Sequence, residues 1–168
     1  MLSEELMNRR RMIMAAKDDS VLYEAFNLSF DGSSYIDTGV YLFTQENINK
    51  DFEFIAEGIS GARISQNTIV CAKHNGNAYG FLIRIDDGTS TAYNGTISVK
   101  STPNVATVIV KRINGVITLS GTNITNPSVK FTNTAFNWPL VLGCAIDDNG
   151  TPFRHRAGNI EHIVVRWL

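Results

Sequence analysis

Two apolar runs flank a tight polar turn near the C-terminal end of the chain. The first run covers Leu140–Ile146, the turn follows at Asp147–Gly150, and the second run covers Ile160–Trp167. In the second run, one alternating set is Ile160, His162, Val164 and Arg166, and the other is Glu161, Ile163, Val165 and Trp167. A period of two is typical of a β-strand, and neither run has helical spacing. The pattern predicts a strand that closes a sheet.

The chain from Val21 onward continues as short β-rich segments separated by turn signals. The other predicted strands are Phe26–Phe30, Tyr35–Thr38, Phe52–Glu57, Thr68–His74, Tyr79–Ile85, Ala92–Val99, Val105–Arg112 and Val116–Ile124. Asn-Gly and Asp-Gly pairs favour tight hairpins because both residues tolerate positive φ. The clearest hairpin turns at Asn114 and Gly115, and another turns at Asn149 and Gly150. About ten short strands at this spacing predict two antiparallel sheets stacked as a sandwich.

The N-terminal segment, from Ser3 to about Lys17, has helical character instead. Ser3 can cap the first turn, and acidic residues follow where the helix dipole favours them. Its apolar and basic residues are Leu2, Leu6, Met7, Arg9, Arg10, Arg11, Met12, Ile13 and Met14. A helix this short is only marginally stable alone in water. It therefore packs on its own domain, frays, or anchors the chain to a partner or within an oligomer. We expect a helical anchor and linker over 1–20 and a β-sandwich domain over 21–168.

Composition narrows the function classes. The 168 residues include 15 basic and 16 acidic side chains, a balance that does not favour nucleic-acid binding. No segment is apolar enough to span a bilayer, and the acidic N-terminus does not suit a secretory signal. We therefore expect a protein made in a cytoplasm without a signal peptide. Cys71 and Cys144 lie within apolar runs, which favours buried reduced thiols over a disulfide.

Three motifs resemble a known family. They are FDGSSYIDTG at 30–39, KDFEF at 50–54, and the closing segment LGCAIDDNGTPFRHRAGNIEHI at 142–163. Together they resemble concanavalin A-like, laminin-G-type jelly rolls, over almost the whole β-rich part. The resemblance implies an all-β, two-sheet antiparallel jelly-roll sandwich behind a short N-terminal α-helix. It places Tyr35, Ile36, Phe52, Phe54, Ile163 and Trp167 in the core between the sheets.

The leader EELMNRRRMIM at 4–14 resembles leaders of tailed-phage structural proteins that carry such a jelly roll. This resemblance implies a non-catalytic adhesion or decoration protein on a virion surface, made in the host bacterial cytoplasm. Its helix would attach it to other virion proteins, and its sandwich would face outward toward cell-surface glycans. A homo-oligomer is expected, and trimers are common among such attachments. The alternatives are a free carbohydrate-binding, lectin-like module and a glycanase of concanavalin A-like fold.

Glycan binding calls for exposed aromatic rings beside planar polar groups. The candidate segments are Tyr93-Asn94, Asn137-Trp138 and Arg154-His155-Arg156, and the residues selected from them are Tyr93, Asn94, Trp138 and Arg154. Trp138 is the first choice, although it can equally cover the core at the end of a sheet. Arg154 begins a basic run that would ordinarily be a solvated face near a turn.

Calcium is the one cofactor considered, because laminin-G-type domains often hold it at the rim of the sandwich. Asp147, Asp148 and Asn149 offer hard oxygen ligands, although an ordinary hairpin turn explains the same residues and is favoured. For a glycanase, Asp51 with Glu53 is the nearest acidic pair, with no third acid continuing the pattern. His74, His155 and His162 lack metal-ligand spacing. No enzymatic activity is expected.

Overall fold

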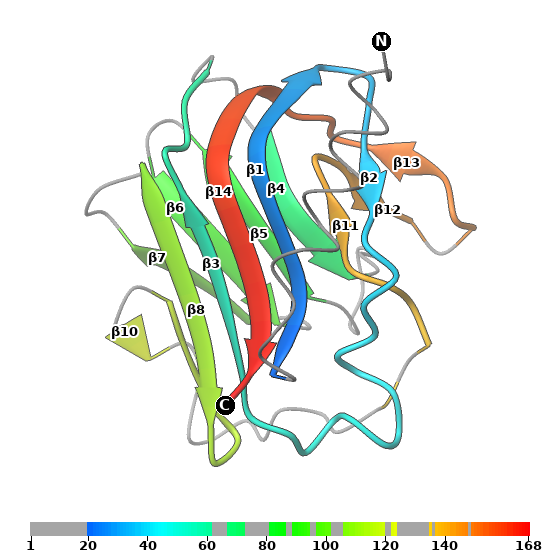
Figure 1. The fold of residues 1–168 in the computed structure, drawn as a ribbon, viewed down its shortest axis with the longest axis vertical. Coiled ribbons are helices and arrows are strands. Elements are labelled where there is room, and N and C mark those ends of the chain that lie inside the picture. The colour runs from blue at the N-terminus through cyan, green and yellow to red at the C-terminus, as the bar shows by residue number, and fades with distance from the viewer. Residues whose placement is uncertain are drawn as a thin grey trace, which may run out of the picture.

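The computed structural model is a sandwich of two antiparallel sheets, shown in Figure 1 with one sheet in front of the other. It describes residues 20–61, 67–72, 81–86, 89–94, 97–101, 106–119, 122–123, 135, 137–147 and 149–168. Within these ranges every element is a strand. The expected N-terminal helix, with Leu2, Leu6, Met7, Arg9, Arg10, Arg11, Met12, Ile13 and Met14, lies outside the described residues. The all-β sandwich expected from the sequence is confirmed.

The two sheets are named here by their place in Figure 1. Across the front sheet, the described strands run in the order β1 (Val21–Asp31), β14 (Ala157–Trp167), β3 (Phe52–Glu57), β8 (Thr107–Ile113), β9 (Val116–Leu119) and β10 (Thr122–Asn123). Across the rear sheet, they run in the order β2 (Ile36–Asp37), β11 (Val141–Leu142), β4 (Asn67–Ala72), β5 (Phe81–Asp86), β6 (Thr89–Asn94) and β7 (Ile97–Ser101). A separate hairpin pairs β12 (Ala145–Ile146) with β13 (Pro152–Phe153).

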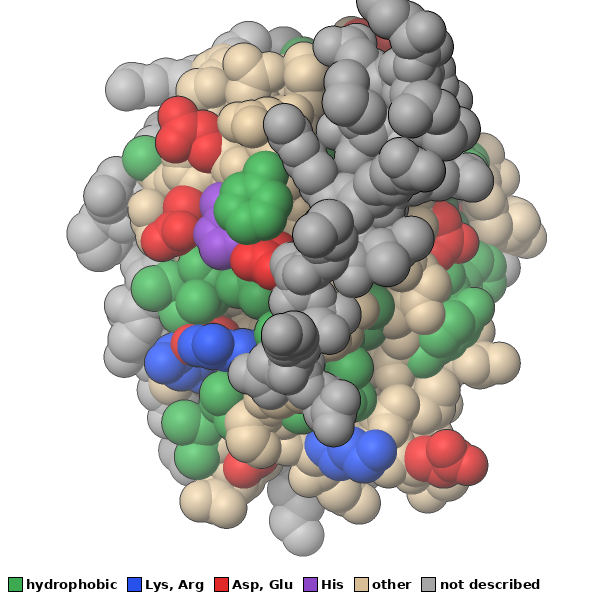
Figure 2. Space-filling model, in the orientation of Figure 1, with side chains coloured by type: hydrophobic (Ala, Val, Ile, Leu, Met, Phe, Trp, Pro, Cys, Tyr) green, Lys and Arg blue, Asp and Glu red, His purple; other side chains and the backbone are tan. Residues whose placement is uncertain are grey.

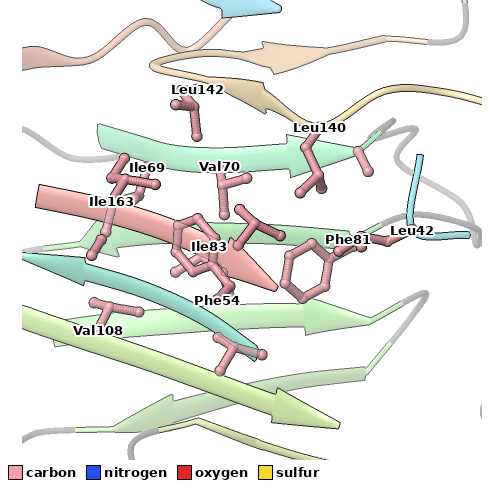
Figure 3. Packing of buried hydrophobic residues seen from close by; sticks show 14 of the residues in the cluster. Leu42, Phe54, Ile69, Val70, Phe81, Ile83, Val108, Leu140, Leu142 and Ile163 are labelled. Atoms are coloured by element: carbon pink, nitrogen blue, oxygen red, sulfur yellow. The ribbon is translucent and has the colours of Figure 1, made fainter. Parts of the chain in front are cut away.

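The core lies between the two sheets. Figure 3 shows Phe54, Val108 and Ile163 of the front sheet close to Ile69, Ile83 and Phe81 of the rear sheet. The rings of Phe52 and Phe81 meet edge to face across the layers, with centroids 6.1 Å apart. Burying side chains of this size contributes roughly 1.5–3 kcal/mol each, so these contacts hold the layers together.

Tyr35 is an exception to the expected core. Its side chain is 46% exposed, whereas Phe52, Phe54 and Ile163 are buried as predicted. The next residue, Ile36, packs against the core from the short strand β2. Successive strand residues point to opposite faces, so the inward position of Ile36 turns Tyr35 outward.

The closing strand β14 lies between β1 and β3, as Figure 1 shows. His162, Val164 and Arg166 face outward opposite β3, while Ile163 and Val165 are buried in the core. The prediction that Ile160 shares the face of His162 is wrong, because Ile160 is fully buried. In the paired strand β1, Phe26 is exposed but Leu28 packs on the core, and Asn27 between them has φ 53°. A left-handed residue here rotates the chain, so the inward face changes at this point of the strand pair.

The start of β1 and the end of β14 are joined tightly. Val21 pairs with Arg166, and the amide of Trp167 donates a 2.8 Å hydrogen bond to the carbonyl of Ser20. The two strands stay paired through to Asp31 and Ala157 at the other end of the sandwich. This ladder is the longest described pairing of the front sheet.

The apolar run 140–146 forms two short strands, and its prediction as one strand is wrong. Gly143 has φ +85°, and a Cβ atom there would lie 2.4 Å from the Phe30 ring. The chain turns at this glycine, so β11 joins the rear sheet and β12 pairs with β13. The predicted strands Val116–Ile124 and Ala92–Val99 are likewise each divided in two.

The predicted turns at Asn114-Gly115 and Asn149-Gly150 are confirmed. Asn114 and Gly115 both have positive φ, 52° and 78°, between β8 and β9. Gly150 has φ 79° in the turn that joins β12 to β13. In each case the glycine supplies a conformation that other residues adopt only with strain.

One side-chain clamp ties the start of β14 to the segment that leaves β3. We call it the Arg156 junction, and it consists of Ser60, Gly61, Asn67, Arg156, Gly158 and Asn159. Ser60 and Asn159 exchange two backbone hydrogen bonds of 3.0 Å. Arg156, only 1% exposed, donates from Nη2 to the carbonyls of Ser60 and Asn159 at 2.6 and 3.1 Å. Its Nη1 donates to Asn67 Oδ1 at 3.2 Å, so one guanidinium holds three separate segments.

Candidate functional site

The β12–β13 hairpin lies over the outer side of the rear sheet. Phe153 of β13 packs against Cys71 of β4, Leu82 of β5 and Ala145 of β12. Cys71 and Leu82 pair directly across the two strands, and both are fully buried although they lie outside the main core cluster. The hairpin therefore shields an apolar row on the outside of the sandwich.

Trp138 and its neighbours cover the end of the same region. Trp138 is partly buried and packs against Val141, Cys144 and Ile146. A Cβ atom at Gly150 would lie 3.5 Å from the indole ring, so the hairpin turn and the indole are in close contact. Trp138 therefore covers the end of the sheet, which is the alternative to glycan binding that the sequence left open for this residue. Part of its surface remains exposed.

Arg154 and His155 follow β13 directly along this edge. The Cζ atom of Arg154 lies 5.1 Å from the centroid of the Phe153 ring, a cation–π distance. The His155 ring lies 6.4 Å from the exposed Tyr35 ring beside β2. We call this surface the hairpin rim, and its residues are Tyr35, Trp138, Phe153, Arg154 and His155.

The structure brings two of the four predicted glycan contacts to the hairpin rim, Trp138 and Arg154. The strand register places Tyr93 opposite Leu82, in the cross-strand row that includes Cys71, and places Asn94 opposite Phe81 in the next row. Sequence reasoning missed Tyr35 and Phe153, whereas His155 lies within the candidate run 154–156. Tyr35 was expected in the core, and the signal that could have found Phe153 is an aromatic residue directly after the turn at Asn149-Gly150.

Two of the predicted calcium ligands, Asp147 and Asn149, serve a turn. Asp147 Oδ1 accepts hydrogen bonds from the amides of Asn149 and Thr151 at 2.9 and 2.8 Å, which is the Asx arrangement of an ordinary hairpin. Asp148 lies outside the described residues. In the part of the chain that the structure describes, no group of three or more His, Cys, Asp or Glu side chains converges to hold a metal ion.

The two cysteines are free and buried, and burial raises the pKa of each thiol to about 12. A thiol needs a lowered pKa to act as a nucleophile, so neither is prepared for that chemistry.

The predicted acidic pair, Asp51 and Glu53, is engaged in structural contacts. Glu53 is 2% exposed, and its carboxylate accepts from Lys111 Nζ and Arg166 Nε, each at 2.7 Å. Burial works to raise the pKa of Glu53, but hydrogen bonds and charge from these two cations bring it below its ordinary value. Asp51 Oδ1 accepts from the amide of Asn114 at 2.8 Å. Glu53 is therefore an ion-pair partner within the sheet, and Asp51 helps to fix the β8–β9 turn.

The outer face of the front sheet carries a second polar cluster, centred on His162 of β14. His162 Nε2 lies 2.9 Å from Glu24 Oε1 of β1, and Nδ1 lies 3.1 Å from Glu57 Oε2 of β3. The ring of Phe26 stacks on the imidazole, with centroids 4.5 Å apart and planes 9° apart. Figure 2 shows a histidine on this face beside acidic side chains and beneath a hydrophobic one. We call Glu24, Phe26, Glu57 and His162 the His162 cluster.

This cluster predicts a pH dependence of stability. Burial works to lower the pKa of His162, but the hydrogen bonds that its imidazole donates to Glu24 and Glu57, together with the negative charges of these carboxylates, outweigh burial and raise the pKa above its ordinary value of 6.5. The resulting stabilisation is complete below the unfolded-state pKa and is lost as pH rises through the higher folded value. We therefore expect His162→Gln to lower the free energy of unfolding more at about pH 5.5 than at about pH 8.5, measured by urea denaturation.

The matched control keeps the histidine and removes its partners. In Glu24→Gln/Glu57→Gln the imidazole remains, but its two charged acceptors are gone. An NMR titration of His162 should then give a lower pKa than in the parent chain. An equal pKa in both proteins would contradict the assignment.

Comparison with known proteins shows the fold. No protein-family model matches the sequence, and no curated protein matches it either. The CBM40 carbohydrate-binding module of the Ruminococcus gnavus IT-sialidase, solved with α2,6-sialyllactose, aligns with a TM-score of 0.61 at 14% identity, over 87% of this chain and 92% of that one. The leech intramolecular trans-sialidase aligns with a TM-score of 0.61 at 14% identity, over 89% of this chain and 26% of that one.

A mutant of the NanB sialidase from Streptococcus pneumoniae aligns with a TM-score of 0.58 at 10% identity, over 87% of this chain and 26% of that one. Similarity at these identities shows a shared β-sandwich jelly roll, consistent with the concanavalin A-like resemblance.

Of the residues described, none form a helix of the length and hydropathy needed to cross a membrane.

Proposed function

We propose that this chain is a non-catalytic carbohydrate-binding module that contacts its glycan through the hairpin rim. The observation that carries the proposal is the exposed Tyr35 ring, which lies 6.4 Å from the His155 ring next to Arg154, itself held over the Phe153 ring. Trp138 packs on Ile146 of the same hairpin and keeps part of its surface exposed. Aromatic rings stack on the apolar faces of sugars, and a guanidinium donates to their oxygens. The fold shared with sialidase-associated modules supports the same function.

Carbohydrate binding replaces the virion component as the preferred hypothesis. The neighbours named above are a sialidase module and sialidases, which support the carbohydrate-binding alternative better than a place on a particle. The anchor helix that favoured a virion lies outside the described residues. Attachment to other virion proteins and oligomerisation remain predictions for the segment 1–20.

Binding to α2,6- and α2,3-sialyllactose, with lactose for comparison, tests the proposal. We expect measurable binding by calorimetry, weakened about fivefold to tenfold by Tyr35→Ala, which corresponds to about 1–1.4 kcal/mol. Trp138→Ala should weaken binding at least as much, with a circular dichroism spectrum recorded to confirm that the variant is folded. Tyr35 is the sharper test because its side chain is 46% exposed and carries little packing.

Two control variants separate this rim from the rest of the surface. Tyr41→Ala removes an aromatic ring of similar exposure, 40%, at another site. Lys50→Gln removes one positive charge beside Trp167, at the opposite end of β14 from Arg154. Both should leave affinity unchanged. Failure to bind any sugar on a broad glycan array, or equal losses in the control variants, would refute the proposal.

A further inference from the structure

The His162 cluster contains an aromatic ring whose position is fixed but whose outer face is open. Phe26 is 55% exposed, although it lies within strand β1 and its neighbour Ala25 is buried. Its inner face stacks on the His162 imidazole at 4.5 Å, nearly parallel. The ring is therefore held in one orientation by a group that is itself held from two sides.

Hydrogen-bond acceptors flank the imidazole on which the Phe26 ring stacks. Glu24 and Glu57 each bond the imidazole through one oxygen. Neither Glu24 Oε2 nor Glu57 Oε1 accepts a hydrogen bond from the residues that the structure describes. Because Glu24 is on β1 and Glu57 is on β3, these acceptors stand on opposite sides of the strand that carries His162.

We propose that the His162 cluster is a second sugar-contacting subsite, which takes a neutral pyranose with its apolar face on Phe26 and its hydroxyl groups donating to Glu24 and Glu57. The ligand class rests on the proposed carbohydrate-binding function. The subsite itself rests on the stacked, half-open ring and its flanking acceptors.

The charges of the cluster select among ligands. An anionic sugar would meet two carboxylates, so this subsite disfavours the acidic glycans that Arg154 favours at the hairpin rim. A cationic side chain would stack on a ring whose other face already lies against an imidazole that carries a positive charge when protonated, which weakens cation–π attraction. A neutral sugar needs only the apolar contact and the acceptors. It avoids both the repulsion that an anion meets and the weakened attraction that a cation meets.

The two surfaces lie on opposite layers of the sandwich. The His162 cluster is on the outer side of the front sheet, whereas the hairpin rim lies along the rear sheet. One module could then contact two branches or two chains of a glycan surface at once, which raises avidity without any new contact.

The test uses NMR of the full chain with lactose, maltotriose, cellotriose and chitotriose as neutral probes. We expect at least one of them to shift the His162 imidazole resonances, and Phe26→Ala to weaken that binding at least about fivefold. The matched variant Phe26→Leu keeps an apolar side chain but removes the π face, so it should lose nearly as much. Tyr35→Ala should leave the His162 shifts in place.

The outcomes separate this inference from the proposed function. If sialyllactose binds in a Tyr35-dependent way but no neutral sugar shifts His162, the second subsite is refuted and the function stands. If neutral sugars bind but shift only hairpin-rim resonances, the subsite is also refuted. Shifts of His162 caused by a pentalysine peptide and by no sugar would identify a cation site instead. If no sugar perturbs either surface, the proposed function itself fails.

Discussion

Replacing Gly158 by alanine is expected to lower the free energy of unfolding by more than about 4 kcal/mol, or to prevent folding. Gly158 has φ +120°, and a Cβ atom there would lie 2.2 Å from the Ser60 carbonyl oxygen and 2.6 Å from Gly61 Cα. Both contacts are to backbone, so no side-chain rotation can relieve them. The paired segment has the same problem, because a Cβ atom at Gly61 would lie 2.6 Å from the Ala157 carbonyl oxygen.

Gly115→Ala is the matched control for Gly158→Ala. Gly115 also has positive φ, +78°, but a Cβ atom there would meet nothing within 4 Å. Its substitution should cost only the left-handed backbone strain of roughly 1–2 kcal/mol. Urea denaturation midpoints measure both variants. Equal losses of unfolding free energy in the two variants would mean that positive φ alone makes Gly158 necessary. The close approach of the two backbones would then contribute nothing to the effect.

Arg156→Ala is expected to have the second largest effect, about 3 kcal/mol. A hydrogen bond to a charged group contributes roughly 1.5–3 kcal/mol, and Arg156 makes three, of which those to Ser60 and Asn67 cross to a part of the chain about ninety residues away. Burial opposes this gain, because it disfavours the charged form and lowers the pKa of Arg156 to about 10. Oxygens of Ser60, Asn67 and Asn159 offset this cost at Nη1 and Nη2, whereas the buried Nε has no hydrogen-bond partner among the described residues.

Two further substitutions at Arg156 separate shape from charge. Arg156→Met fills most of the side-chain volume but has no hydrogen-bond donor. Arg156→Lys keeps the positive charge but donates from one nitrogen, whereas the guanidinium donates from both Nη1 and Nη2. We expect the order of stability to be the parent chain, then Lys, then Met, with Ala lowest, measured by thermal and urea unfolding. A Met variant as stable as the parent would show that the clamp contributes only packing.

The sandwich could be predicted from the sequence because its signals are local. Alternation identified β14, and the Asn114-Gly115 pair identified the β8–β9 turn, since period and turn chemistry depend on near neighbours. The division of run 140–146 at Gly143 could not be read, because it depends on the Phe30 ring, which is distant in the sequence. The inward face of β14 changes at Ile160 because of Asn27, a residue of the partner strand.

The functional surfaces were less accessible to sequence reasoning. Trp138 was identified as an aromatic residue in a loop-like segment and Arg154 as the start of a basic run, and the fold places both at the β12–β13 hairpin. The family resemblance placed Tyr35 in the core, but its exposure follows from the orientation of the short strand β2, which the sequence pattern does not reveal. Arg156 was read as part of a solvated basic run, whereas it is buried, because its acceptors Ser60 and Asn67 come from a distant segment of the chain. The His162 cluster likewise assembles residues from three strands.

The adjacency of Ser20 and Trp167 has a practical consequence for engineering. A short peptide bridge between these two positions would connect the first and last strands without stretching either. New chain ends could then be opened at Asn114-Gly115, where the turn is exposed. A circular permutant of this kind would keep both sheets while moving the point of attachment to a different side of the molecule, so the orientation of a fused or immobilised copy could be chosen at will.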